Sequence, residues 1–124
     1  MNTLTDIRHD LHRHPELAYE ETRTSEVVQR ELAAAGVAFV GGLAGGTGVL
    51  AHIPGGDGSP IALRADMDAL PIVEQTGLPY ASETEGRMHA CGHDGHTTIL
   101  IGVARELAKS SQAGTLGRPV TLIF

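Results

Sequence analysis

The chain has 124 residues, 41% of them hydrophobic, which predicts one globular domain with a buried aliphatic core. Nine basic and fifteen acidic residues give a net charge of −6, and the basic residues are scattered, which argues against a nucleic-acid partner. The polar first residues lack the apolar core of a secretory signal, and no apolar run approaches the roughly 20 residues that cross a bilayer, so we expect a cytoplasmic protein without membrane contact.

The first predicted element is a short amphipathic helix over residues 4–11, where apolar side chains recur at three- and four-residue spacing. Pro15 disfavours helical backbone in the residue before it, so this helix should end at or before His14. The two histidines near its end, His12 and His14, are predicted to be solvated and to complement the helix dipole rather than to bind a metal.

A second, longer helix is predicted in EETRTSEVVQRELAAAGV (20–37), where apolar residues share one face and Gly36 is placed to cap the end. Three apolar runs bounded by Gly or Pro are predicted as strands, at residues 37–40, 48–53 and 60–65. The turn-like segment PGGDGSP predicts that the last two strands form a hairpin or lie side by side in one sheet. GGLAGGTG (41–48) lacks the spacing and the Lys of a phosphate-binding loop, so we interpret it as a flexible connection.

Residues 66–93 show no apolar periodicity, and a loop this long inside a compact domain is uncommon unless it is functional. Helical spacing then predicts a helix over residues 95–107, and PVTLIF (119–124) predicts a buried strand. Natural domains seldom finish on a bare apolar strand, so the chain looks cut, and we expect this strand to form an exposed edge. Together the elements predict part of a three-layer α/β/α domain with a mixed sheet.

The segment HACGHDGHT (89–97) places the only cysteine of the chain among histidines, just before a predicted helix. Cys91 and His93 are two residues apart, and in an extended segment their side chains would share one side, so a thiolate and an imidazole could bind one cation. Asp94 is placed to cap the helix and to support a ligand by a hydrogen bond. Two other interpretations stay open, a Cys nucleophile with a His base and a small buried thiol without chemistry.

A second constellation lies in LRADMDALP (63–71), where two carboxylates follow an apolar strand. Asp66 and Asp68 are two residues apart, so both are expected to project from the carboxyl end of that strand into one crevice, the usual location of sites in open α/β sheets. The competing interpretation is that one Asp starts a turn and the other is solvated.

Three long motifs occur in one order along the chain: RHDLHRHPELAYEETRTSEVV, ALRADMDALPI and GRMHACGHDGHTTILIGVA. In this order they closely resemble the N-terminal third of the metal-dependent amidohydrolases related to aminoacylases and carboxypeptidases, particularly the branch with hippurate hydrolases and auxin-conjugate hydrolases. The resemblance covers residues 1–124, which would be the N-terminal part of the catalytic domain.

The resemblance implies that Cys91 and His93 are two ligands of a site for two divalent metal ions. Asp66, Asp68 and Asp94 are given supporting roles. A thiolate ligand favours Zn, while carboxylate and imidazole ligands also bind Mn, Co or Ni. The implied reaction is hydrolysis of the amide bond of N-acyl amino acids or small peptides by a metal-activated water.

The same resemblance implies parts that lie beyond Phe124. Relatives carry a Glu-Glu pair after the strand that PVTLIF resembles, the first as general base and the second as metal ligand, and later an inserted dimerisation domain. The full-length protein is therefore expected to be a homo-oligomer, and the 124-residue chain to be inactive by itself. The alternative is a truncated, non-catalytic metal-binding or interaction module.

Overall fold

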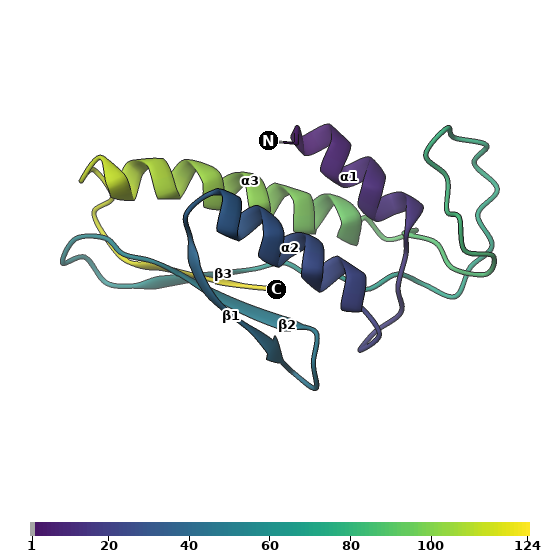
Figure 1. Ribbon diagram of the computed structural model, residues 1–124, viewed down its shortest axis with the longest axis horizontal. Helices are drawn as coiled ribbons and strands as arrows, with labels where there is room; N and C mark the ends of the chain where they lie inside the picture. Colours follow the sequence, from purple (N-terminus) through teal and green to yellow (C-terminus); the bar gives the residue numbers. More distant parts are fainter. Residues whose placement is uncertain (1) are drawn as a thin grey trace.

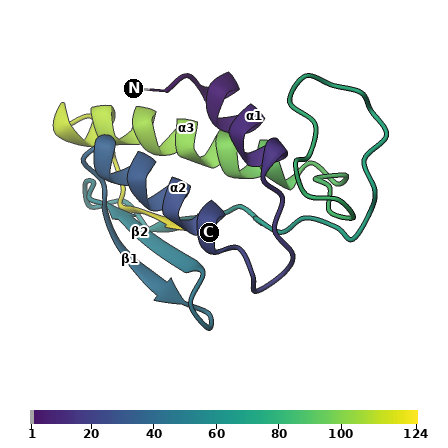
Figure 2. The same cartoon turned by 45° about the vertical axis from the view of Figure 1, so that its right-hand side comes forward.

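The computed structural model describes residues 2–124, which form three helices and four strands in a mixed α/β fold, as predicted. In chain order these are α1 (Leu4–Arg13), α2 (Thr22–Ala34), β1 (Ala38–Leu43), β2 (Gly48–Ile53), β3 (Ile61–Arg64), α3 (His93–Gln112) and β4 (Val120–Ile123). The long loop between β3 and α3 extends beyond the end of the sheet (Figures 1 and 2). None of the helices within residues 2–124 has the length and apolarity needed to span a bilayer.

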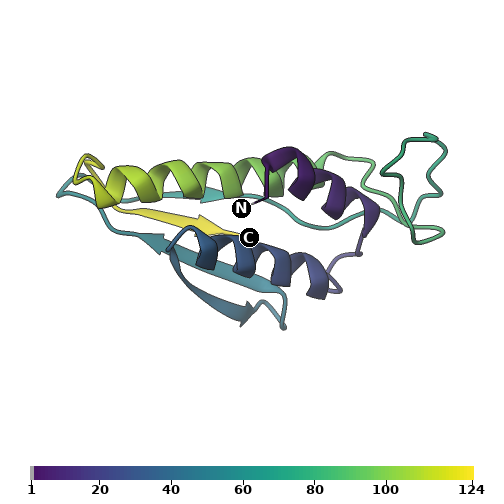
Figure 3. The same ribbon diagram turned by 45° about the horizontal axis from the view of Figure 1, so that its top comes forward.

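The strand order in the sheet is β1-β2-β4-β3. β1 and β2 form an antiparallel hairpin, β4 pairs antiparallel with β2, and β3 and β4 are parallel. β4 (yellow) therefore lies between β2 and β3 (Figure 3). Two predictions are wrong: β2 and β3 are not neighbours, and the last strand is interior rather than an edge. The reason is the crossover through α3, which returns the chain parallel to β3 and inserts β4 beside it.

One face of the sheet packs against the helices. Val49, Ala51 and Ile53 of β2 are buried in the same core as the inner residues of all three helices, whereas Leu50, between them on the strand, is 41% exposed. This alternation is the expected one for a sheet covered on one side, because successive side chains point to opposite faces. Residues 2–124 thus form a four-stranded sheet with one layer of helices on it.

The predicted C-terminal ends of α1 and α2, which a proline and a glycine mark in the sequence, agree with the structure. α1 ends at Arg13, before His14 and Pro15. Gly36, at φ +71°, follows the C-cap of α2, and its N–H donates to Ala33 O at 3.0 Å while the next N–H, that of Val37, donates to Leu32 O at 3.0 Å. This is the Schellman arrangement, which favours Gly because other residues rarely adopt positive φ.

The β2–β3 connection packs closely on the α3–β4 connection. Gly56 N donates to Leu116 O at 2.8 Å, and Gly58 N donates to Gly117 O at 3.0 Å. A Cβ added at Gly55 would lie 2.1 Å from Arg118 O, so a larger residue there forces the backbone apart. The two connections are therefore in direct backbone contact.

We expect Gly55→Ala to lower the free energy of unfolding by about 3 kcal/mol, the upper part of the range for overpacking, because the clash is with backbone atoms. Urea unfolding followed by circular dichroism measures this. Gly117→Ala is the control, since its Cβ would meet nothing within 4 Å, and it should change stability by less than about 0.5 kcal/mol. Equal effects of the two substitutions would contradict the close packing.

Candidate metal centre

The candidate site lies where the carboxyl end of β3 meets the first turn of α3. The ladder between the parallel strands continues one residue past β3, because Ala65 N donates to Ile123 O at 2.9 Å. Asp66 follows directly, and its backbone carbonyl accepts a hydrogen bond from Thr97 Oγ1 of α3 at 2.8 Å. The strand end and the helix start are therefore held against each other.

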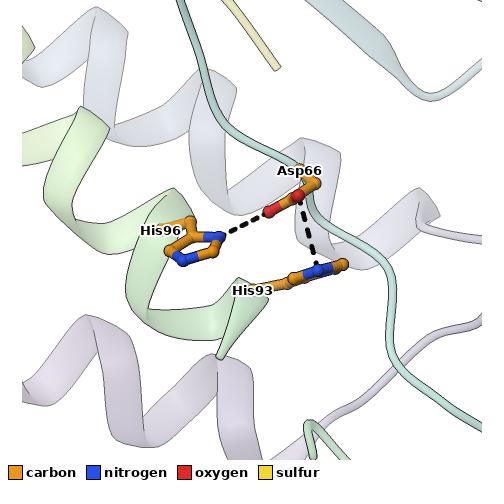
Figure 4. Close-up of side chains that lie close together, drawn as sticks. All are labelled: Asp66, His93 and His96. Carbon is orange, nitrogen blue, oxygen red and sulfur yellow. Dashed lines mark hydrogen bonds and ion pairs between the residues drawn. The ribbon is translucent and has the colours of Figure 1, made fainter. Parts of the chain in front are cut away.

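Three side chains meet at this junction, one carboxylate and two imidazoles (Figure 4). Asp66 Oδ1 lies 2.7 Å from His96 Nδ1, and Asp66 Oδ2 lies 3.4 Å from His93 Nε2. One ligand atom from each of the three residues falls within 4.8 Å of the others. Two imidazole nitrogens and a carboxylate oxygen form a ligand set that Zn²⁺ takes in proteins, so these residues fit a divalent ion.

Asp68 fixes the orientation of His93. His93 Nδ1 lies 2.9 Å from Asp68 Oδ1 and 2.9 Å from the Asp68 backbone carbonyl. Both partners only accept, so Nδ1 must donate, which leaves the lone pair on Nε2, the nitrogen that faces Asp66. Metal-binding histidines commonly donate their second nitrogen to a carboxylate or carbonyl in this way.

Asp66 carries a negative charge at neutral pH. Partial burial opposes its ionisation, but the hydrogen bond from His96 and the electrostatic effect of the neighbouring His93 and His96 rings outweigh burial and hold the pKa of Asp66 below its usual 3.8. An ionised carboxylate beside two imidazoles attracts a cation.

The two carboxylates predicted to share a crevice do so. Asp66 and Asp68 both line an open cleft of about 280 Å³, together with Tyr19, Thr47 and Phe124. The cleft lies at the carboxyl ends of the parallel strands β3 and β4, where sites of open α/β sheets are usually found.

Cys91 is not a member of this group. It is exposed and precedes Gly92, the N-cap of α3, whose φ of +93° bends the chain into the helix. The extended backbone assumed for Cys91 and His93 is therefore wrong, because α3 begins at His93 itself. Within residues 2–124, the three side chains whose ligand atoms gather are Asp66, His93 and His96, without the thiol.

Asp94 does not cap α3, contrary to the prediction. It lies in the first turn of the helix, is 1% exposed, and its Oδ2 lies 2.8 Å from His12 Nδ1. The prediction that His12 is solvated is also wrong, since its side chain is buried between α1 and α3. His14, the other histidine of that pair, is partly exposed and bonds Asp10 O at 2.8 Å.

His96 is the residue of the group that the sequence interpretation did not assign. Its spacing of three residues from His93 is the available signal, because residues three apart share a face of a helix. Its contact with Asp66 depends on how the strand end meets α3, which local spacing does not reveal.

Comparison with known proteins identifies a matching family model and several similar proteins. The model of peptidase family M20/M25/M40 matches residues 62–124. An N-acetylcysteine deacetylase of Bacillus subtilis is 50% identical over 82% of this chain and 27% of its own length. IAA-amino acid hydrolase ILR1-like 5 of Arabidopsis thaliana is 46% identical over 98% of this chain and 27% of its own length.

Among solved structures, the chain is similar to the YXEP protein of Bacillus subtilis, described as a dinuclear metal binding peptidase from the M20 family. The two share 46% identity and a TM-score of 0.88, over 98% of this chain and 34% of that one. The chain thus spans about a quarter to a third of the length of these three proteins.

Proposed function

Because the chain belongs to peptidase family M20/M25/M40, we propose that the protein is a metal-dependent hydrolase that cleaves the amide bond of N-acyl amino acids or small peptides. The observation that carries this proposal is the meeting of Asp66, His93 and His96 at the edge of an open cleft. Relatives named as a deacetylase and as an amino-acid-conjugate hydrolase support the substrate class. A cytoplasmic location remains a prediction from composition.

We propose that the site holds two divalent ions, Zn or Mn, with Co or Ni as further candidates. The dinuclear description of YXEP supports the number of ions. His93 and Cys91 are the proposed ligands, and Asp66 and His96, whose ligand atoms gather with that of His93, are further candidates. When bound, such ions lower the pKa of water and polarise an amide carbonyl.

The residues of this chain would prepare the site for that chemistry. Asp68 orients His93 through Nδ1, and Asp66 adds negative charge next to it. We place the general base beyond Phe124, where a Glu-Glu pair is expected. The parallel pairing of β3 and β4 supports this placement, because residues that follow Phe124 would emerge beside Asp66.

On this proposal residues 1–124 are the N-terminal part of a catalytic domain, and the intact protein is a homo-oligomer. The 124-residue chain alone should then hydrolyse no N-acetyl or N-benzoyl amino acid. The intact protein should do so, lose activity on treatment with a chelator, and regain it with Zn or Mn.

Release of the free amino acid, followed by chromatography, measures this activity. Hydrolysis by the 124-residue chain would contradict the proposed division of the site. Activity of the intact protein that survives removal of metal would contradict the proposed mechanism.

A further inference from the structure

A buried histidine of α1 bridges two carboxylates from distant parts of the chain. His12 Nδ1 lies 2.8 Å from Asp94 Oδ2, and His12 Nε2 lies 3.1 Å from Glu74 Oε1. The side chain of His12 is 5% exposed, that of Glu74 4% and that of Asp94 1%. We call His12, Glu74 and Asp94 the His12 clamp.

Hydrogen bonds and a nearby positive charge stabilise the carboxylates of the clamp. Each ring nitrogen of His12 lies within hydrogen-bond distance of one carboxylate oxygen. Burial opposes the ionisation of Glu74, but hydrogen bonds from Thr76, Ser82 N and His12 outweigh it and hold the pKa of Glu74 below 4.5. Arg8 Nε, 3.4 Å from Asp94 Oδ2, places a positive charge beside that carboxylate. Charged hydrogen bonds between buried groups are among the stronger ones in proteins.

The clamp joins three segments that lie far apart in the sequence. His12 belongs to α1, Glu74 to the loop between β3 and α3, and Asp94 to the first turn of α3. Residues 65–92 form neither helix nor regular strand, apart from one isolated bridge between Leu70 and Met88. A segment of this kind has much backbone freedom to lose on ordering.

The two ends of that loop carry the candidate site. Asp66 and Asp68 lie at its start, and Cys91 lies at its end, just before His93. Glu74 is itself held by Ser82 N at 3.0 Å, so the bond from His12 ties down a folded part of the loop rather than a free side chain. Asp94 directly follows His93, so the bond on the other side of the ring fixes the first turn of α3.

We propose that His12 is a positioning residue that, through Glu74 and Asp94, holds the loop and the start of α3 in the arrangement that binds a divalent ion. This inference rests on the proposed function, and it concerns a residue outside the candidate ligands. His12 acts through its neighbours and touches neither the metal nor the substrate.

The test is titration of the metal-free intact protein with Zn²⁺ or Co²⁺, followed by calorimetry and by Co²⁺ absorption. His12→Asn should weaken binding about 10–100-fold, the range for outer partners of metal ligands, and should speed amide hydrogen exchange in residues 71–94. His52→Asn is the matched control, because His52 is an exposed histidine of β2, and it should bind as the parent does.

A purely structural role for His12 predicts a different result, namely a lower free energy of unfolding with unchanged affinity of the folded protein. Parent-like affinity of folded His12→Asn would therefore overturn the proposal. Where His12→Asn fails to fold, Glu74→Ala is the second test, since it removes the loop side of the clamp together with the bonds that Thr76 and Ser82 N donate to Glu74. It should weaken binding about 10-fold, and parent-like affinity would overturn the proposal.

His93→Ala separates this inference from the proposed function. Unchanged metal affinity in His93→Ala would defeat the proposed metal centre and the clamp with it. Weakened binding in His93→Ala together with parent-like binding in folded His12→Asn would defeat the clamp alone.

Discussion

Replacing His93 by alanine is expected to weaken Zn²⁺ binding by the intact protein more than about 100-fold, because loss of an outer partner alone costs roughly 10–100-fold. His93 Nε2 faces Asp66, and its Nδ1 is held by Asp68, so this side chain is the best oriented of the candidate ligands. Hydrolysis of N-acyl amino acids should fall in parallel. Calorimetric titration of the metal-free protein gives the affinity.

Two companion variants make this test specific. His52→Ala removes an exposed imidazole on β2 and should change neither affinity nor activity. Cys91→Ser should also weaken binding, and it should abolish the thiolate-to-metal absorption of the Co²⁺ protein. Retention of that absorption, or of parent-like metal content, would show that Cys91 is a bystander.

A large effect on stability is expected at Glu31, a buried carboxylate that joins α2 to α3. It is 3% exposed and accepts from Arg105 Nη2 at 2.8 Å and from Arg30 Nη2 at 3.0 Å. We expect Glu31→Gln to lower the free energy of unfolding by roughly 3 kcal/mol at pH 7, because it leaves the partly buried Arg105 without its counter-charge. Urea unfolding measures this difference.

The effect should depend on pH with a definite sign. Burial opposes ionisation of Glu31, but hydrogen bonds from Arg30, Arg105 and Asn2 outweigh it and hold its pKa below the usual 4.5. A carboxyl group with a lowered pKa in the folded state contributes stability above its unfolded pKa and loses it as the pH falls through the folded pKa. The difference between parent and Glu31→Gln should therefore shrink as the pH falls below about 4.5.

Glu106→Gln is the control for this pair of experiments. Glu106 is 72% exposed, and it pairs with Lys109 on the surface of α3. Exposed pairs of this kind contribute at most about 1 kcal/mol. A Glu31→Gln deficit that stays constant down to low pH would contradict the assigned ion pair.

The helix ends that depend on residues adjacent in the sequence were predicted correctly. Pro15 marks the end of α1, and Gly36 closes α2, because each restricts the backbone locally. The sheet order was predicted wrongly, because the apolar pattern of β2 and of β3 says which residues are buried and not which strand lies between them.

For the candidate site, the sequence located the segments but not their contacts. Asp66 and Asp68 were expected in one crevice because both follow a strand, and they line one. The start of α3 was placed two residues late because Gly92 caps it by its backbone conformation rather than by a side chain. His12 was expected in solvent because nothing near it in sequence indicates Asp94 or Glu74.

By itself the sequence determined that this chain is a mixed α/β domain of a metallohydrolase family, since periodicity, Gly and Pro, and three ordered motifs are local properties. Only the tertiary structure decided that β4 is interior, that His96 joins Asp66 and His93, and that His12 is buried. These features depend on how α3 crosses from β3 to β4 and packs on α1. Contacts between residues far apart in the chain follow from that packing, and no spacing within a segment encodes them.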